Sequence, residues 1–274
     1  MPEMVPLWEH LVELAGGGDL AARFLSLYRP PAYLTGCSQA VWPGQEPVLV
    51  RNYDYSPRAF EGLLLRSGWR GVGVMGMSDC LIGLLDGVNE SGLAVSLAFG
   101  GTRTVGDGFG VPIILRYVLQ TCHTAREAAR VLARVPTHMA YNVTVLDRSH
   151  TRFTVRLSPH REAIITHSAV ATNHQQPVEW DYAHATASIE RERHLFRLRA
   201  NKYQSQAEFI GAFLESPLYS TAFNRGFGTL YTAAYRTLDA CVELAWPSSL
   251  HRVFALDRFQ EAHWVVNYES SRSG

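Results

Sequence analysis

Lysine is almost missing from this chain of 274 residues: Lys202 is the only one, and the other 24 basic residues are arginine. A phosphate-binding P-loop and a lysine Schiff base each need a lysine at a defined place, so both are excluded elsewhere in the chain. The 25 basic and 25 acidic residues give no net charge. No overall field then attracts nucleic acid or an anionic membrane, and we expect neither as a partner.

Long apolar runs and paired cysteines are also lacking. No run reaches the length of a membrane span, and the acidic N-terminus lacks the basic and apolar regions of a signal peptide. We therefore expect a cytoplasmic protein. Its cysteines are far apart, form no CxxC pair and are expected to be free thiols, namely Cys37, Cys80, Cys122 and Cys241. The histidines show no metal-binding spacing, so we expect no metal and no bound cofactor.

Strand and helix patterns alternate in blocks, which are strands at 37–99, helices at 111–135, strands at 140–173, helices at 186–215 and strands at 229–247 and 263–269. One or two short helices are expected before them, in 5–28. No repeat and no flexible linker divides the chain. Two antiparallel sheets with helices outside would bury this pattern, which predicts a single α+β domain.

Cys37 differs from the other cysteines because Gly36 precedes it and an Arg-Asn-Tyr-Asp run follows. If the Gly36–Cys37 bond is cut, Cys37 gains a free α-amine with a pKa of about 7.7–8.0, against about 8.5 for an ordinary thiol. Such an amine is a usable general base near neutral pH, so the nucleophile would carry its own base. Gly36 suits cleavage because it has no Cβ beside its carbonyl.

Arg51 and Asp54 follow on the next strand pattern. A guanidinium near the sulfur favours the thiolate, and Asp54 can accept a hydrogen bond from the new ammonium group. Side chains alternate along a regular strand, so these two residues would point to opposite faces. We expect a bulge or the end of the strand near Asn52–Tyr53 to bring both to Cys37. A surface ion pair at a strand end is the alternative.

Together these residues resemble the N-terminal-nucleophile (Ntn) hydrolases of the choloylglycine hydrolase and acyl-CoA:6-aminopenicillanic acid acyltransferase group, which act on linear amides. Gly-Cys-Ser at 36–38 and Arg-Asn-Tyr-Asp at 51–54 carry the resemblance. Similar motifs follow in the family's order, as Asn-Glu-x-Gly-Leu within Asp86–Ser96, Pro-x-x-x-Arg and Thr-Ala-x-Glu-Ala within Gly108–Ala128, Thr-Asn within Ala171–His174, and Ser-x-x-Arg within Ser188–Leu198. The resemblance covers about 37–246.

The resemblance implies a four-layer αββα sandwich of two mainly antiparallel sheets and self-cleavage before Cys37. Cys37 would be nucleophile and base, and Arg51 and Asp54 would position it. Asn173 would donate its side-chain amide to the oxyanion, while Arg191 would support the charges of the site. Asn173 also ends a strand pattern, where an amide donor can face a cleft, although a turn-forming asparagine is the alternative there.

One departure from the family concerns the oxyanion hole. Bile-salt hydrolases place a second asparagine in a Leu-Asn-Phe run, where this chain has Ala98. A backbone N–H at Phe99 or Gly100 is the candidate replacement. This departure and the long segment before the cysteine resemble the acyltransferase branch. We expect residues 1–36 to form a pro-segment that stays bound after cleavage, and 37–274 to form the catalytic domain.

The sequence thus predicts a self-processing amidohydrolase that cleaves small-molecule N-acyl amides through a thioester on Cys37. An N-acyltransferase that uses acyl-CoA as co-substrate shares this chemistry and is the first alternative. A binding protein with an intact Gly36–Cys37 bond is the alternative of another class. Besides the substrate, the expected partner is the chain's own cleaved segment. A homo-oligomer and the identity of the substrate stay open.

Overall fold

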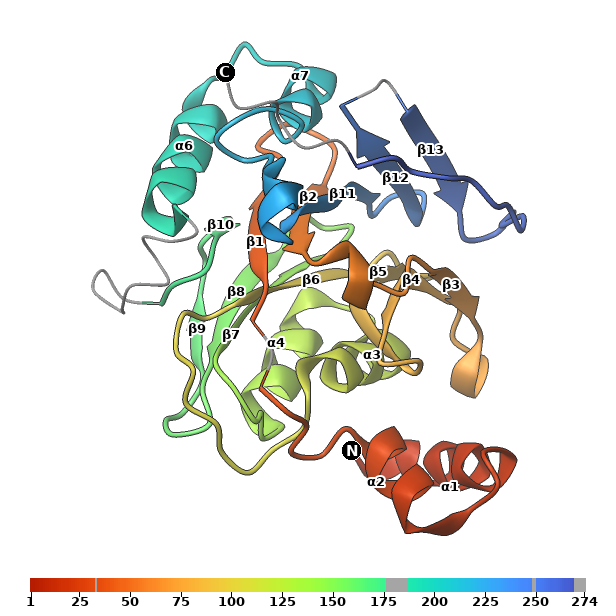
Figure 1. The fold of residues 1–274 in the computed structure, drawn as a ribbon. Coiled ribbons are helices and arrows are strands. Elements are labelled where there is room, and N and C mark those ends of the chain that lie inside the picture. The colour runs from red at the N-terminus through yellow and green to blue at the C-terminus, as the bar shows by residue number, and fades with distance from the viewer. Residues whose placement is uncertain (33, 176–186, 248–249, 269–274) are drawn as a thin grey trace.

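Two antiparallel sheets form the centre of this computed structural model (Figure 1). The structure describes residues 1–32, 34–175, 187–247 and 250–268. The six-stranded sheet contains, in spatial order, β10 (Val170–Ala171), β1 (Gly36–Val41), β2 (Val48–Tyr55), β11 (Gly228–Arg236), β12 (Cys241–Trp246) and β13 (Leu250–Ala255). The seven-stranded sheet contains β3 (Leu64–Ser67), β4 (Val74–Asp79), β5 (Gly83–Asn89), β6 (Ala94–Phe99), β7 (Tyr141–Leu146), β8 (Arg152–Leu157) and β9 (Ile164–Thr166).

The central strands are buried along their whole length. Every residue of β1, β5, β6 and β7 is buried. A strand is buried on both faces when a second sheet covers one face and helices cover the other. The core of the protein therefore lies between the two sheets, and polar side chains on these strands are removed from water.

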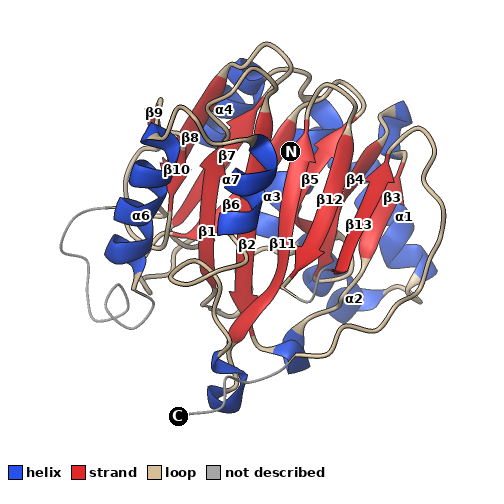
Figure 2. Cartoon of the chain, turned by 90° about the horizontal axis from the view of Figure 1, so that it is seen from above, coloured by secondary structure: helices blue, strands red, loops and turns tan. Residues whose placement is uncertain are grey.

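Helices cover both outer faces of the sandwich (Figure 2). They are α3 (Val111–Thr121), α4 (Ala125–Arg134), α6 (Ser188–Ala200) and α7 (Gln206–Ala212). On the seven-stranded sheet, α3 packs on β5 and α4 packs on β8. On the other sheet, α6 contacts β10 and β1, while α7 places Phe209 and Ile210 in an apolar cluster with Val50 of β2. This order of layers confirms the predicted α+β fold and αββα sandwich.

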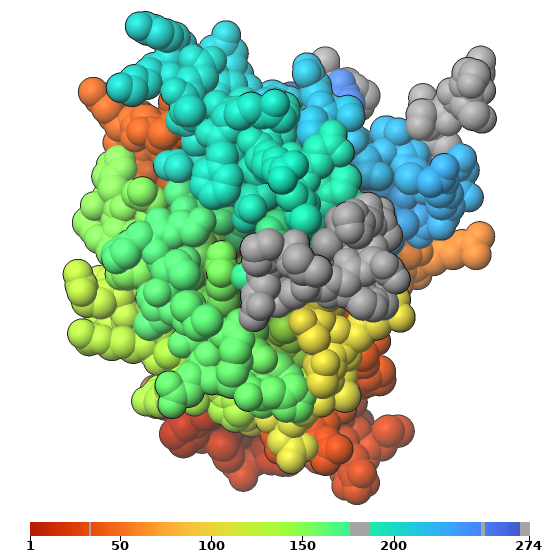
Figure 3. Space-filling view, turned by 90° about the vertical axis from the view of Figure 1, so that its left-hand side faces the viewer, coloured from red at the N-terminus to blue at the C-terminus, as the bar shows by residue number. Residues whose placement is uncertain are grey.

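The N-terminal segment is a helical hairpin at one end of the molecule, far from α6 and α7 (Figure 3, red against cyan). It contains a 3₁₀ turn, η1 (Pro2–Met4), and two helices, α1 (Val5–Leu14) and α2 (Gly18–Ser26). Its apolar face meets the body around a cavity of about 230 Å³, whose walls include Met4, Trp8, Leu11, Trp69, Ile82 and Ile113. Backbone hydrogen bonds from Arg29 to Gly108 and from Gly110 to Leu27 fasten the following linker.

The C-terminal part corrects one prediction. The strand expected at 263–269 is wrong for the described residues 263–268, which have no regular secondary structure. The last strand among the described residues is instead β13. The apolar side chains that produced the pattern, Trp264 and Val266, line a cavity instead of pairing in a sheet. The described residues also form the 3₁₀ turns η2 (Pro57–Ala59), η3 (Trp69–Gly71) and η4 (Ala222–Arg225).

Candidate active site

Cys37 lies near the start of β1 with its side chain between the two sheets. Gln39, two residues on, shares this face and contacts Ser96 and the Asn142 carbonyl of the opposite sheet. The Cys37 side chain is fully buried. Its sulfur accepts a hydrogen bond from Arg51 Nη2 at 3.3 Å and lies 3.7 Å from the Thr35 hydroxyl. A guanidinium donating to sulfur favours the thiolate form.

Arg51 contacts Cys37 and Asp54 lies against Gly36, on opposite faces of the sheet, and this corrects the expected bulge. The pairing of β1 with β2 is regular from Gly36 opposite Asp54 to Val41 opposite Leu49. The irregularity lies instead on β11, between Thr229 and Tyr231. Because β2 alternates without a break, Arg51 reaches the sulfur on the inner face and Asp54 lies on the outer face.

A buried carboxylate that the sequence did not single out holds Arg51 in place. Arg51 Nη1 donates to Asp86 Oδ2, and the Tyr231 and Tyr235 hydroxyls also donate to Asp86. Burial opposes the charge of Arg51, but Tyr231, Cys37 and Asp86 together raise the pKa of Arg51 well above its usual value. Asp86 was placed in a hairpin motif. Asp86 could have been identified as a site residue because it is an aspartate in a strand, β5, whose residues are all buried.

Asn173 of the Thr-Asn motif and Arg191 of the Ser-x-x-Arg motif both bind the backbone of Cys37. The Cys37 N–H donates to Asn173 Oδ1 at 2.9 Å. Arg191 on α6 donates to the Cys37 carbonyl at 2.7 Å and to Asn173 Oδ1 at 2.7 Å. Segments 136 and 154 residues away in sequence therefore meet at one residue.

Asp54 lies beside the peptide bond that precedes Cys37. A Cβ added to Gly36 would lie 2.9 Å from Asp54 Cβ and 3.0 Å from Asp54 Oδ2, so only glycine fits without a shift. Thr229 donates to Asp54 at 2.6 Å, and Arg191 Nη1 lies 3.6 Å from its carboxylate. Burial raises the pKa of Asp54 above its usual value, although Arg191 and Thr229 act in the opposite direction.

Two residues outside the predicted set fix Asn173. Ser188, at the start of α6, accepts a hydrogen bond from the Asn173 N–H at 2.7 Å. Asn142 on β7 donates to the Thr172 and His174 carbonyls on either side, at 2.8 and 3.0 Å. Ser188 belongs to the quoted Ser-x-x-Arg motif, but no local pattern linked Asn142 to this loop.

Two of the predicted oxyanion donors already have protein partners. The Gly100 N–H donates to the Ala140 carbonyl at 2.8 Å. Asn173 Nδ2 donates to the Phe99 carbonyl at 3.2 Å. A substrate oxygen would therefore have to share or replace these hydrogen bonds.

All four cysteines are free thiols, as predicted. Cys122 and Cys241 are buried, but Cys80 lies half-buried in the turn between β4 and β5 and not within a strand. In the part of the chain that the structure describes, no three His, Cys, Asp or Glu side chains gather as metal ligands would. None of the described helices combines the length and apolar character that crossing a membrane requires.

Comparisons with known proteins agree with this architecture. Residues 42–250 match the family described as acyl-coenzyme A:6-aminopenicillanic acid acyl-transferase. No curated protein matches the chain in sequence. A solved Caenorhabditis elegans N-acylethanolamine-hydrolyzing acid amidase ortholog is 15% identical over 85% of this chain and 100% of its own, with a TM-score of 0.55.

Two bacterial structures are more distant. A variant of conjugated bile acid hydrolase from Clostridium perfringens is 10% identical, over 86% of this chain and 99% of its own, with a TM-score of 0.50. Penicillin V acylase from Agrobacterium tumefaciens is 14% identical, over 81% and 87%, with a TM-score of 0.48. Identities this low bear on the fold alone.

Proposed function

The chain belongs to the acyl-coenzyme A:6-aminopenicillanic acid acyl-transferase family of Ntn-type amidohydrolases and acyltransferases, and from this premise we propose a self-processing amidohydrolase that cleaves linear N-acyl amides through a thioester on Cys37. One observation carries the proposal. Cys37 is contacted at its sulfur by Arg51 and at its backbone by Asn173 and Arg191. A packing cysteine needs neither set of contacts, whereas an N-terminal nucleophile uses its sulfur and its amine separately.

Processing begins at the Gly36–Cys37 peptide bond. The Cys37 sulfur attacks the Gly36 carbonyl carbon, the C–N bond breaks, and the nitrogen takes up a proton to become the α-amine of Cys37. Water then hydrolyses the thioester and leaves a carboxylate on Gly36. Asp54 supports this step because its carboxylate lies against Gly36, and Asn173 Oδ1 is placed to hold the new amine.

Turnover repeats the same chemistry on a substrate. The α-amine takes the thiol proton, the sulfur attacks the acyl carbon of the amide, and the protonated amine returns the proton to the leaving nitrogen. Asn173 Nδ2 would turn from the Phe99 carbonyl to the oxyanion, a donation worth roughly 3–4 kcal/mol in acyl transfer. Water releases the acid from the thioester.

Residues 1–36 act as a pro-segment that stays bound to the catalytic domain, 37–274. The segment is attached to the body through the apolar face of α1 and through the linker hydrogen bonds, and these contacts do not depend on the Gly36–Cys37 bond. The cleaved product is then a complex of two chains.

Acyl transfer is the second candidate, because the matching family is described as an acyl-CoA-dependent transferase. In that reaction an amine replaces water as the acceptor of the acyl group on Cys37, or acyl-CoA loads the thiol. Incubation of the processed protein with an acyl-CoA and an amine, followed by product analysis, separates the two reactions. Net amide formation would assign transfer, and amide cleavage alone would assign hydrolysis.

Intact-mass measurement of purified protein tests self-processing. The wild type should split between Gly36 and Cys37, while Cys37→Ala should stay full length and lack turnover of N-acyl amides. Cys122→Ala is the matched control, because Cys122 is also buried, at 2% exposure, but lies at the end of α3 away from the site. This variant should split and turn over normally.

Three outcomes separate the alternatives. Turnover that survives Cys37→Ala contradicts the assignment of the nucleophile. A wild type that folds, never splits and turns over no amide favours the binding protein. A wild type that stays intact but hydrolyses amides through Cys37 contradicts self-processing alone.

A further inference from the structure

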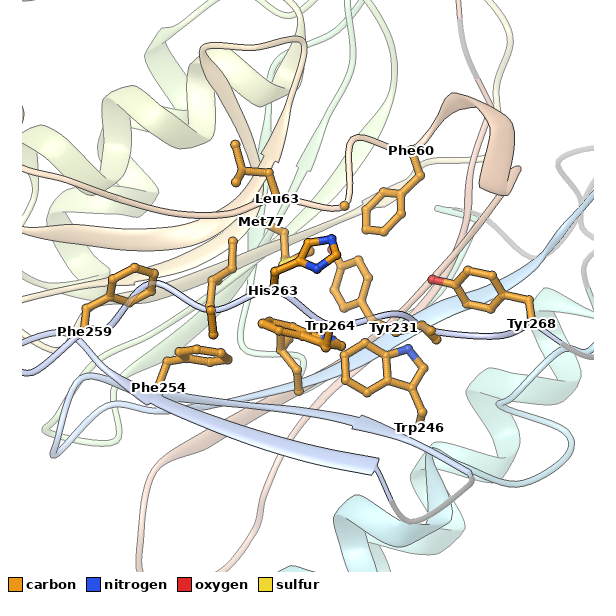
Figure 4. Close-up of a pocket in the computed structure, with 15 residues that line it drawn as sticks. Phe60, Leu63, Met77, Tyr231, Trp246, Phe254, Phe259, His263, Trp264 and Tyr268 are labelled. Carbon is orange, nitrogen blue, oxygen red and sulfur yellow. The ribbon is translucent and has the colours of Figure 1, made fainter.

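An aromatic cavity of about 250 Å³ lies between the free edges of the two sheets (Figure 4). Its walls come from the loop before β3, from β4, from β11 to β13 and from residues 259–268. The aromatic side chains around it include Phe60, Tyr231, Trp246, Phe254, Phe259, Trp264 and Tyr268. Among the described residues that line it, His263 is the one titratable side chain besides the tyrosines, and none is an arginine, a lysine or an acid, so the cavity suits an uncharged apolar group.

A row of side chains connects this cavity to the nucleophile. Cys37 pairs with Tyr53, Tyr53 pairs with Tyr231, and the next register position, on β12, is Trp246. Directly opposed residues of antiparallel strands place their side chains on the same face. The row therefore crosses the inner face from the sulfur to the cavity, and two strand spacings give roughly 10 Å from Cys37 to Tyr231.

Phe60 covers the middle of this row. Its ring stacks on Tyr231, with 5.7 Å between centroids and 22° between planes, and lies 6.1 Å from the ring of Tyr53. Phe60 is half-buried and belongs to an irregular connection between β2 and β3. A chain that left the sulfur along the row would have to displace the Phe60 ring from the two tyrosines, and its end would then enter the cavity.

We propose that this cavity binds the distal end of the substrate's acyl group, and that the preferred acyl group is apolar and of medium length. The inference rests on the proposed function. An acyl group bound to Cys37 must span the row from Cys37 to Tyr231 before its distal end reaches the cavity. An acetyl group is too short to do so. The cavity itself exceeds the engineered space of about 150 Å³ that holds one benzene, but is below the range of about 300–1,000 Å³ for drug-sized ligands. A fused ring system such as a steroid would therefore not fit.

Most of the outer wall lies outside the region shared with the family. The family match ends at residue 250, and Phe254, Phe259 and Trp264 follow it. Phe254 stacks on Trp264 at 5.5 Å, so β13 and the C-terminal segment form one wall. The acyl preference is then a property of this chain's own C-terminal residues.

Leu63→Trp tests the proposal by filling the cavity from its rim. The ratio of kcat/KM for a decanoyl amide to that for the acetyl amide of the same amine should fall at least about tenfold. Val253→Trp is the matched control, because Val253 neighbours Phe254 on β13 but is 62% exposed on the opposite face. This control should keep the wild-type ratio. A phenylacetyl amide in the same series tells a preference for linear chains from one for aryl groups.

Calorimetric titration with decanoate, on the full chain carrying Cys37→Ala, measures binding without turnover. Binding should weaken at least about tenfold when Leu63→Trp is added and should not change with Val253→Trp. If Leu63→Trp fails to fold, Trp264→Ala takes its place and should shift the selectivity towards longer acyl groups. Equal selectivity and equal decanoate binding in all variants would overturn the cavity proposal while leaving amide turnover intact. Decanoate binding without any amide turnover would instead overturn the proposed function.

Discussion

Among the residues that the structure describes, Arg51 and Arg116 are fully buried arginines, and their surroundings are opposite in kind. Arg51, between the sheets, contacts the Asp86 carboxylate, the Tyr231 hydroxyl and the thiol of Cys37. Arg116, on α3, donates to the Ile82 carbonyl at 3.1 Å and to Ser67 at 2.6 Å, and its guanidinium lies 4.3 Å from the centre of the Trp69 ring. Its Nη2 has no partner, and burial lowers the pKa of Arg116 to about 10.

This difference indicates that the charge of Arg116 has a structural role, whereas the charge of Arg51 faces the sulfur of Cys37. Arg116 donates only to neutral groups and packs on an aromatic ring. Arg51 is fixed by Asp86 so that its second nitrogen faces sulfur. Buried ion pairs are weak evidence for stability, because desolvation offsets the attraction. The pair of Arg51 with Asp86 is better explained by the orientation that it imposes at Cys37.

Arg51→Met should give the largest effect. It leaves Asp86 buried without its cation, which costs about 3–5 kcal/mol of folding free energy. Self-cleavage and amide turnover should both be lost. Chemical denaturation and intact mass measure the two effects, and Arg51→Lys should recover part of the stability because it retains the charge. Full activity in a folded Arg51→Met protein would remove Arg51 from the site.

Asp86→Asn should come second. The amide keeps an acceptor oxygen but loses the charge that orients Arg51, and hydrogen bonds to charged groups contribute about 1.5–3 kcal/mol. We expect a stability loss of about 2 kcal/mol and a fall in kcat of tenfold or more, with little change in KM. Tyr235→Phe removes one hydroxyl from the same carboxylate and should give a smaller change in the same direction. A change in KM alone would speak against a positioning role.

Asp79, a half-buried aspartate at the end of β4, gives the folding stability a pH dependence. Burial and the charge of Glu61 raise the pKa of Asp79 to about 6. The folded state holds the Asp79 proton more tightly than the unfolded chain does. The contribution of Asp79 to the folding stability is therefore fully present below about pH 4 and is lost as the pH rises through about 6. One pKa unit corresponds to about 1.4 kcal/mol, so the decline is on the order of 1–2 kcal/mol after screening by solvent.

The test of this dependence is Asp79→Asn. This variant should unfold at a higher temperature than the wild type at pH 8 and at a similar temperature at pH 4. Thermal unfolding followed by circular dichroism across this range measures the difference. A gap between the two proteins that does not vary with pH would show that Asp79 is not protonated in the way described.

Arg116→Met should give the smallest effect. An apolar side chain of similar length replaces a buried charge that has no carboxylate, and such replacements are often neutral or stabilising. We expect the folding free energy to change by less than about 1 kcal/mol and turnover to stay within about twofold. A loss as large as that of Arg51→Met would mean that the two arginines do not differ as the structure indicates.

Much of the site could be predicted from the sequence because its residues lie in short motifs. Cys37, Asn173 and Arg191 were expected in one site because each belongs to a motif with a resemblance to known enzymes, and hydrogen bonds join them in the structure. The prediction that a bulge brings Arg51 and Asp54 to one face of the sheet is wrong, because the pairing of β2 with β1 is regular. The last strand was misplaced because aromatic residues at 263–268 pack on a cavity and mimic the alternation of a strand.

The sequence by itself determined the chemical groups, their order and the alternation of strand and helix patterns, because these depend on neighbours along the chain. Only the tertiary structure decided which carboxylate meets Arg51 and where the aromatic cavity forms. Asp86 and Tyr231 reach Arg51 across 35 and 180 residues of sequence. Contacts of that separation depend on how two whole sheets pack, and local residue preferences carry no information about that packing.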